Sequence, residues 1–263
     1  IVRANAERLA LLFAEGGLPE AAVHILLDRC WKRLEPHAPQ RFLAEMQGIV
    51  AGATEAGFEL SLAHLQRIIT CTNLDMYKRE ERLPEFLGED GLQLMAALAD
   101  VPSLSCSMFA VWGARTEDGK LYSLRNLDWL SQSGMHAARL VSVVRPAEGN
   151  AFVSAGYAGV IGCLAGMNDK GITLSEVGAF SVREELDGIP WVFLARQVLE
   201  ESNCLEDAVA RIENATHTLG YNYLVGDGDT AHFGTPAFRP RAAAFETNAA
   251  CCVTFYENDP QEQ

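Results

Sequence analysis

A cysteine, an arginine and an aspartate occur within residues 105–129 at spacings that a simple local fold would bring together. Cys106 begins a strand-like apolar run, a Glu-Asp-Gly turn follows, and a second strand-like run ends in Arg125-Asn126-Leu127-Asp128. Because a β-hairpin places its distant ends side by side, we expect Cys106 to face Arg125 and Asp128 across the pair. A cation and a carboxylate beside a sulfur are surroundings that activate a thiolate nucleophile.

Three segments carry a resemblance to a known group of enzymes. They are Leu121-Tyr122-Ser123-Leu124-Arg125-Asn126-Leu127-Asp128-Trp129, then Gly166-Met167-Asn168-Asp169-Lys170-Gly171-Ile172, then Gly188-Ile189-Pro190 before a helix carrying Arg196. With Cys106 ahead of them, they resemble the N-terminal-nucleophile (Ntn) hydrolases, in particular the penicillin acyltransferase family and the choloylglycine hydrolase and acid ceramidase group. The resemblance spans roughly Cys106 to Phe255, and Arg-Asn-x-Asp is its most specific part.

The resemblance implies an enzyme that activates itself. The Cys106 thiol would cut the Ser105–Cys106 peptide bond, and the new Cys106 α-amino group would serve as the base for its own sulfur. An α-amine titrates at ~8 and a thiol at ~8.5, so this proton exchange is feasible close to neutral pH. Asp128 would orient the ammonium group, and Arg125 would favour the thiolate by its charge.

Acyl transfer also needs hydrogen-bond donors for the oxyanion that develops on the substrate. In the choloylglycine group an asparagine after a threonine supplies one, and Thr247-Asn248 stands at the matching place. The resemblance therefore implies that Asn248 is the side-chain donor, although an asparagine there could equally close a turn. Asn222 is the weaker candidate for oxyanion or substrate binding, since at the head of a strand it could satisfy nearby backbone groups instead.

Two departures from the bile salt hydrolases narrow the expected substrate. Gly178 stands where those enzymes have another site asparagine, and their late arginine has no counterpart before the sequence ends at Gln263. Bile salt specificity is therefore unsupported, whereas a generic amidase or acyltransferase fits.

The remaining cysteines and the histidines suggest structural roles. Free cysteine is among the most buried residue types, which favours packing for Cys30, Cys71, Cys163 and Cys204. The number of cysteines is odd, and adjacent Cys251 and Cys252 cannot bridge each other without strain, so a reducing compartment is the simpler interpretation. The six histidines lack metal-ligand spacing, and no phosphate-binding loop is present; we expect no metal and no cofactor.

Charge and hydropathy limit the partners. The net charge of −14 disfavours nucleic acid and anionic membrane surfaces. No signal peptide is visible, and the longest apolar stretches fall well short of the ~18 residues of a membrane span. We therefore expect a cytoplasmic protein without membrane insertion that acts on a small-molecule amide or N-acyl substrate. A homo-oligomer is left open.

Hydrophobic periodicity divides the chain into two parts. Helices are expected at Ala6–Phe13, Pro19–Leu34, Ala38–Ala56, Ser61–Ile69, Gly91–Ala99, Val192–Glu201 and Leu205–Ala215. Strands are expected at Ser107–Trp112, Lys120–Leu124, Leu140–Val144, Ala151–Ala155, Val160–Ala165, Ile172–Val177 and Tyr221–Val225. This pattern indicates an α+β protein with sheets covered by helices.

The resemblance adds the layer order, which periodicity alone does not give: a four-layer αββα sandwich. Residues 1–105 would form a helical N-terminal segment, as a pro-segment or α-subunit. Residues 106–263 would form the nucleophile-bearing αββα region, either truncated at its C-terminus or given without its C-terminal region, and the two parts would make one compact unit.

These observations predict an autoproteolytically activated amidohydrolase or acyltransferase that works on a linear amide bond through a Cys106 thioester. Two alternatives remain at this point. One is a catalytically silent relative that binds a ligand or partner, and the other is an ester or lipid hydrolase with the same nucleophile.

Overall fold

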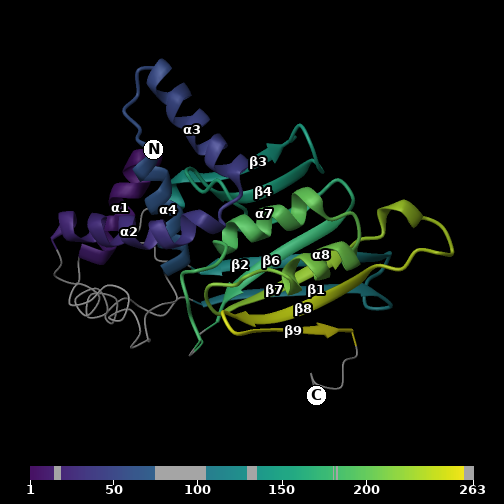
Figure 1. Cartoon of the computed structure of the whole chain (residues 1–263). Coiled ribbons are helices and arrows are strands. Elements are labelled where there is room, and N and C mark those ends of the chain that lie inside the picture. The colour runs from purple at the N-terminus through teal and green to yellow at the C-terminus, as the bar shows by residue number, and fades with distance from the viewer. Residues whose placement is uncertain (15–18, 75–104, 129–134, 180, 182, 258–263) are drawn as a thin grey trace.

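The computed structural model describes the chain except for residues 15–18, 75–104, 129–134, 180, 182 and 258–263 (Figure 1). Its N-terminal part consists of helices α1 (Val2–Ala14), α2 (Glu20–Leu34), α3 (Gln40–Glu55) and α4 (Leu62–Leu74), with the short 3₁₀ helix η1 (Glu35–His37) after α2. The helices expected here are confirmed, apart from the one at 91–99, which lies outside the described residues. In α2 the buried side chains recur every three or four positions, which gives the helix one apolar face.

The expected hairpin is confirmed. Strand β1 (Ser105–Gly113) pairs antiparallel with β2 (Gly119–Asp128), and the turn between them uses Gly113 and Gly119 at φ +61° and +72°. Such left-handed values are readily adopted by glycine, which has no Cβ. Along β2 half-buried and exposed side chains alternate strictly, so one face of the hairpin packs against the protein and the other faces outward.

A seven-stranded antiparallel sheet forms the centre of the described structure. Its strands lie side by side in chain order. They are β3 (Arg139–Val144), β4 (Phe152–Tyr157), β5 (Ala165–Asn168), β6 (Ile172–Gly178), β7 (Tyr221–Asp227), β8 (Arg241–Asn248) and β9 (Cys251–Tyr256).

The strand expected at 160–165 is wrong in position, because the sheet resumes only at Ala165. The preceding segment is tied to a helix instead: the Cys163 N–H donates to the Val192 carbonyl at 2.9 Å. A Cβ on Gly162 would lie 2.4 Å from that same oxygen, so only glycine fits this approach.

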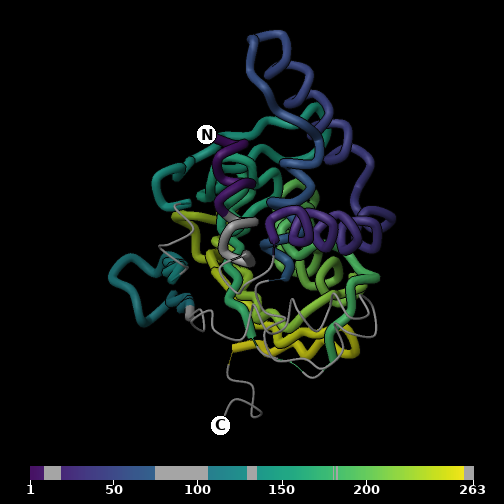
Figure 2. The backbone as a smooth tube through the Cα atoms, turned by 90° about the vertical axis from the view of Figure 1, so that its left-hand side faces the viewer, coloured from purple at the N-terminus to yellow at the C-terminus, as the bar shows by residue number. Residues whose placement is uncertain are grey.

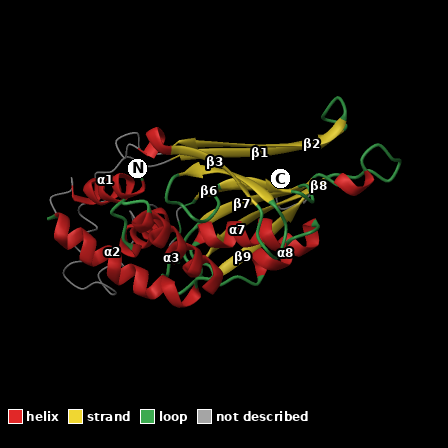
Figure 3. Ribbon diagram, turned by 90° about the horizontal axis from the view of Figure 1, so that it is seen from above, coloured by secondary structure: helices red, strands yellow, loops and turns green. Residues whose placement is uncertain are grey.

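Helices α7 (Trp191–Glu201) and α8 (Leu205–Glu213) cover one face of the sheet, and the hairpin lies on the other (Figure 3). The contact with the hairpin is close, because a Cβ built on Gly226 of β7 would lie 2.9 Å from Leu121 of β2. The α+β class expected from the sequence is therefore confirmed, with layers in the order helices, sheet, hairpin. Among the described residues, no helix covers the outer face of the hairpin, where the resemblance places the fourth layer.

The N-terminal helices close one end of the sandwich (Figures 1 and 2). Arg196 of α7 forms a bidentate pair with Glu45 of α3, with nitrogen–oxygen distances of 3.0 and 2.6 Å. The Trp191 indole donates to the Thr72 carbonyl at the end of α4. Helix α7 is consequently enclosed on both sides and is buried along nearly its whole length. In the part of the chain that the structure describes, no helix is both long enough and apolar enough to span a bilayer.

Candidate active site

Cys106 and Arg125 lie together on the inner face of the hairpin. In the register of the two strands Cys106 is opposite Leu127, two residues from Arg125 and therefore on the same face. Arg125 Nη2 is 3.9 Å from Cys106 Sγ, and Cys106 is half-buried. A guanidinium held this close to a sulfur favours the thiolate form.

Arg125 is fixed from the opposite side by Glu176 of β6. Its Nε donates to the Glu176 backbone carbonyl at 2.5 Å, and its Nη2 donates to Glu176 Oε2 at 3.0 Å. Arg125 can reach Glu176 because β5 pairs with β6 only at Thr173 and Leu174, and Glu176 lies beyond the end of that pairing. The guanidinium thus bridges a sulfur and a carboxylate.

Glu176 is a buried carboxyl group, with 2% of its surface exposed. Burial raises its pKa to about 7, against the opposing effect of the Arg125 charge and hydrogen bond. Its protonation state therefore changes near neutral pH. When Glu176 is ionised it neutralises Arg125, and when it is protonated the Arg125 charge is left to act on Cys106.

The expected convergence of Cys106, Arg125 and Asp128 is wrong for the Asp128 side chain. Residues three apart in a strand point to opposite faces, so Asp128 lies on the outer face of the hairpin. There both carboxylate oxygens accept from Asn126 Nδ2, each at 2.9 Å. The Asp128 backbone nevertheless pairs with Ser105, immediately beside the Ser105–Cys106 peptide bond. Its role toward the Cys106 ammonium stays a prediction.

The two asparagines expected to bind an oxyanion lie at the same end of the sheet, on the face that meets the hairpin. Asn222 pairs with Glu246, and Asn248 lies two residues further along β8 on that face. The Asn248 Oδ1 accepts from the backbone N–H groups of Ala250 and Cys251 at 2.8 and 3.0 Å and so closes the β8–β9 turn. This is the alternative role that the sequence left open, while the donor role of either residue stays a prediction.

Sequence reasoning missed Glu176 as a partner of Arg125. The signal was a single carboxylate inside the expected strand Ile172–Val177. A carboxylate in a buried strand needs a cation or several hydrogen-bond donors, so it could have been singled out.

Several other cysteines lie in settings that hold them as neutral thiols. Burial raises the pKa of Cys30 to about 12 and the pKa values of Cys163 and Cys252 to about 11. Cys71 is buried within α4, as its sequence context predicts. These environments set Cys106, with its guanidinium neighbour, apart from the structural thiols.

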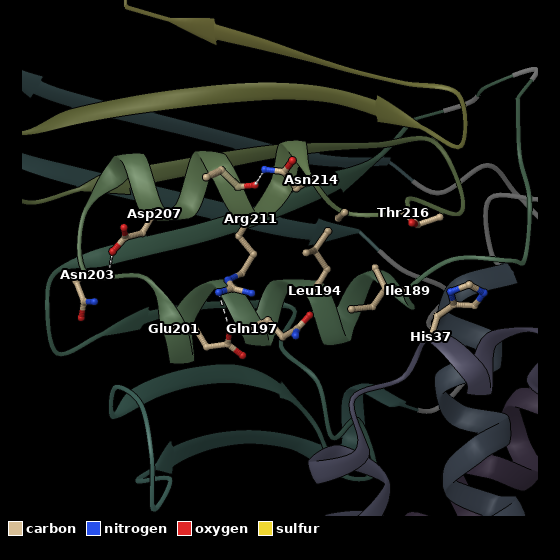
Figure 4. Close-up of a pocket in the computed structure, with 12 residues that line it drawn as sticks. His37, Ile189, Leu194, Gln197, Glu201, Asn203, Asp207, Arg211, Asn214 and Thr216 are labelled. Carbon is tan, nitrogen blue, oxygen red and sulfur yellow. Dashed lines mark hydrogen bonds and ion pairs between the residues drawn. The ribbon is translucent and has the colours of Figure 1, made fainter.

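A polar cavity of about 700 Å³ lies between α7 and α8 (Figure 4). Glu201 and Arg211 form an ion pair of 2.6 Å within it, and His37 of η1 lies at its end. Because these helices cover the face of the sheet that is turned away from the hairpin, this cavity does not adjoin Cys106. No cluster of three or more potential metal ligands occurs within the described parts of the chain.

Comparison with known proteins gives relatives of greater length. An uncharacterized protein of Archaeoglobus fulgidus is 26% identical over 74% of this chain and 31% of its own length. The protein dcd1A of Dictyostelium discoideum is 25% identical over 84% of this chain and 45% of its own. The chain thus spans less than half of the length of each of these relatives.

A solved structure, the Caenorhabditis elegans ortholog of N-acylethanolamine-hydrolyzing acid amidase, aligns with 61% of this chain and 66% of its own. The TM-score is 0.45 and the identity 15%, a likeness too low to carry an argument. A family model gives the stronger result. Residues 114–251, just over half of the chain, match the model described as acyl-coenzyme A:6-aminopenicillanic acid acyl-transferase. The match begins after Cys106 and includes Arg125, Glu176 and both candidate asparagines. The chain therefore belongs to the acyl-coenzyme A:6-aminopenicillanic acid acyl-transferase family.

Proposed function

We propose that this protein hydrolyses or forms a linear amide bond through a thioester on Cys106, after cutting its own chain between Ser105 and Cys106. The observation that carries the proposal is the position of the Cys106 sulfur, 3.9 Å from a guanidinium that a buried carboxylate holds in place. Membership of an acyltransferase family supports the same reaction class.

Self-cleavage would begin with the attack of the Cys106 sulfur on the Ser105 carbonyl carbon. The acyl group shifts from nitrogen to sulfur, and water then hydrolyses the thioester, which releases a Ser105 carboxylate and a free Cys106 α-amine. That amine lies next to the thiol whose proton it must accept. The backbone pairing of Asp128 with Ser105 supports a role for Asp128 beside the new amine, which its carboxylate would fulfil by turning from the outer face of the hairpin.

Turnover would use the same sulfur. The thiolate attacks the substrate carbonyl carbon, the carbon–nitrogen bond breaks, and the amine leaves with the proton that the Cys106 ammonium supplies. Water or an acceptor amine then attacks the thioester carbon and frees the sulfur. Arg125 stabilises the thiolate at the start and end of this cycle.

Intact-mass measurement of the purified chain tests the proposal. The wild type should resolve into two fragments that meet between Ser105 and Cys106, whereas Cys106→Ala should remain one chain, because alanine has no nucleophile. Cys251→Ala is a matched control, since Cys251 is exposed on β9. Processing of Cys106→Ala at the same bond would show that an external protease is responsible.

Acyl transfer is tested separately with p-nitrophenyl acetate and a panel of N-acyl amides. A burst of p-nitrophenol, with the acetyl group mapped to Cys106, should appear in the processed wild type and be absent in Cys106→Ala. A processed protein that gives no burst and turns over no amide would instead fit a silent binding relative.

A further inference from the structure

Tyr157, the last residue of β4, lies on the face of the sheet that meets the hairpin. Val153, four residues earlier on the same face, connects through cross-strand pairs to Thr173 and Gly226. Residues directly opposite one another in antiparallel strands share a face, and Gly226 approaches Leu121 of the hairpin. The Tyr157 side chain is therefore on the same side of the sheet as Cys106.

Tyr157 also lies at the same end of the sheet as Cys106. Along β2, Leu121 meets β7 at Gly226 and Arg125 meets β6 at Glu176, so the strand runs toward the end at which Cys106 starts β1. The last residue pair between β4 and β5 is Ala155 with Ala165, so Tyr157 lies beyond the end of β5. Glu176 of β6 also lies beyond the residues that pair with β5, so no β5 backbone separates β4 from β6 at this level. Arg125 reaches into this space from the hairpin.

Electrostatics agree with this placement. Burial raises the pKa of Tyr157, while the Arg125 charge lowers it and a Cys106 thiolate raises it. Arg125 and Cys106 therefore both influence the phenol electrostatically. Because its pKa is raised, the phenol stays protonated at neutral pH and can donate a hydrogen bond.

The backbone holds Tyr157 firmly. The Tyr157 carbonyl accepts from the Val160 N–H at 3.1 Å, and the next residue, Ala158, donates to the Ala138 carbonyl at 2.9 Å. Gly159 has φ +98°, and a Cβ there would lie 2.6 Å from Ile68 Cδ1 in α4. The turn after Tyr157 is therefore fixed against the N-terminal helices, which gives the phenol the rigid support that a preorganised donor needs.

We propose that the Tyr157 hydroxyl donates a hydrogen bond to the acyl oxygen of a substrate at Cys106, and so stabilises the oxyanion of the tetrahedral intermediate. This inference rests on the proposed function, because it presupposes acyl transfer to Cys106. Tyr223, another tyrosine near Glu176, does not qualify: it pairs with Glu176 on the helix-covered face and is only 1% exposed.

Two reactions of Cys106 test the assignment, using Tyr157→Phe with Tyr122→Phe as the matched control. Tyr122 is exposed on the outer face of the hairpin, where its hydroxyl donates to Asp118. Acylation by p-nitrophenyl acetate passes through an oxyanion, so Tyr157→Phe should slow the burst by about 100-fold, the typical effect of removing one oxyanion donor. Alkylation by iodoacetamide forms no oxyanion, so its rate at Cys106 should stay within about twofold of wild type.

Each result decides the question. Acylation within about twofold of wild type, or an equal loss in both reactions, would overturn the inference, since the phenol would then act on nothing or on the sulfur itself. If wild type shows the burst and Cys106→Ala does not, the proposed function stands even when Tyr157→Phe is unaffected. If processed wild type shows no burst at Cys106 and turns over no amide, the proposed function fails and this inference fails with it.

Discussion

Replacing Glu176 by glutamine tests the central electrostatic argument, namely that burial outweighs the Arg125 ion pair. Glutamine keeps the shape and an oxygen acceptor for Arg125 but cannot titrate. In the folded protein the pKa of Glu176 rises from its ordinary value of 4.5 to about 7. A raised pKa means that the folded state binds this proton more tightly than the unfolded chain does.

The sign and size of the effect follow from this linkage. The stability that Glu176 contributes is fully present below pH 4.5, where both states are protonated, and is lost as the pH rises through 7. A shift of this size corresponds to about 3 kcal/mol. The free energy of unfolding of the wild type, minus that of Glu176→Gln, should therefore fall by about 3 kcal/mol between pH 4.5 and pH 8.

Urea unfolding at half-unit pH steps, followed by circular dichroism, gives this difference directly. Glu246→Gln is the control, because it removes an exposed carboxylate from the same sheet and exposed charges contribute little. Parallel stability profiles for wild type and Glu176→Gln would refute the reasoning, since Arg125 would then keep Glu176 ionised throughout this range.

Three further predictions concern the site and the support of the fold. Asp128→Asn removes the charge expected to orient the Cys106 ammonium, so turnover should fall by ~100-fold, and unchanged kcat would remove Asp128 from the site. Arg196→Met removes the cation that Glu45 and buried Glu200 share and leaves Glu200 only the half-exposed Arg41, which should cost about 3 kcal/mol in urea unfolding, whereas Arg241→Met, at an exposed pair with Glu206, should cost about 1 kcal/mol or less. Iodoacetamide at neutral pH should label Cys106 in the processed protein far faster than Cys30, Cys163 or Cys252, as measured by peptide mapping, and labelling spread evenly over these four thiols would favour the binding alternative.

Local patterns in the sequence predicted the hairpin and most helices because these elements depend on neighbouring residues. The turn needs glycine at Gly119, and alternation along β2 defines its two faces. The same alternation forbids the Arg125 and Asp128 side chains from sharing a face. The expected convergence of Asp128 with Cys106 was wrong because it considered only how close the two strand ends lie and ignored which face each side chain points to.

Other features depend on contacts that no local pattern encodes. Strands β8 and β9 were not among those expected from the sequence. Strand β8 contains three consecutive alanines, Ala242–Ala244, and alanine is a residue type that is depleted in strands. Packing on β7 and α8 overrides that weak preference. The Arg125–Glu176 contact joins residues 51 positions apart and exists only once the hairpin lies on the sheet.

The early end of β5 explains why an arginine can occupy this site at all. If the strand continued backward through Gly162, its backbone would pair with β6 beside Glu176 and close the approach that Arg125 uses. The bond from Cys163 to the Val192 carbonyl holds that segment against α7 instead. Helix α7 is itself clamped to the N-terminal helices through Arg196 and Glu45. Residues 1–74 therefore do more than precede the nucleophile, because their packing supports the opening in which the cation that faces Cys106 is held.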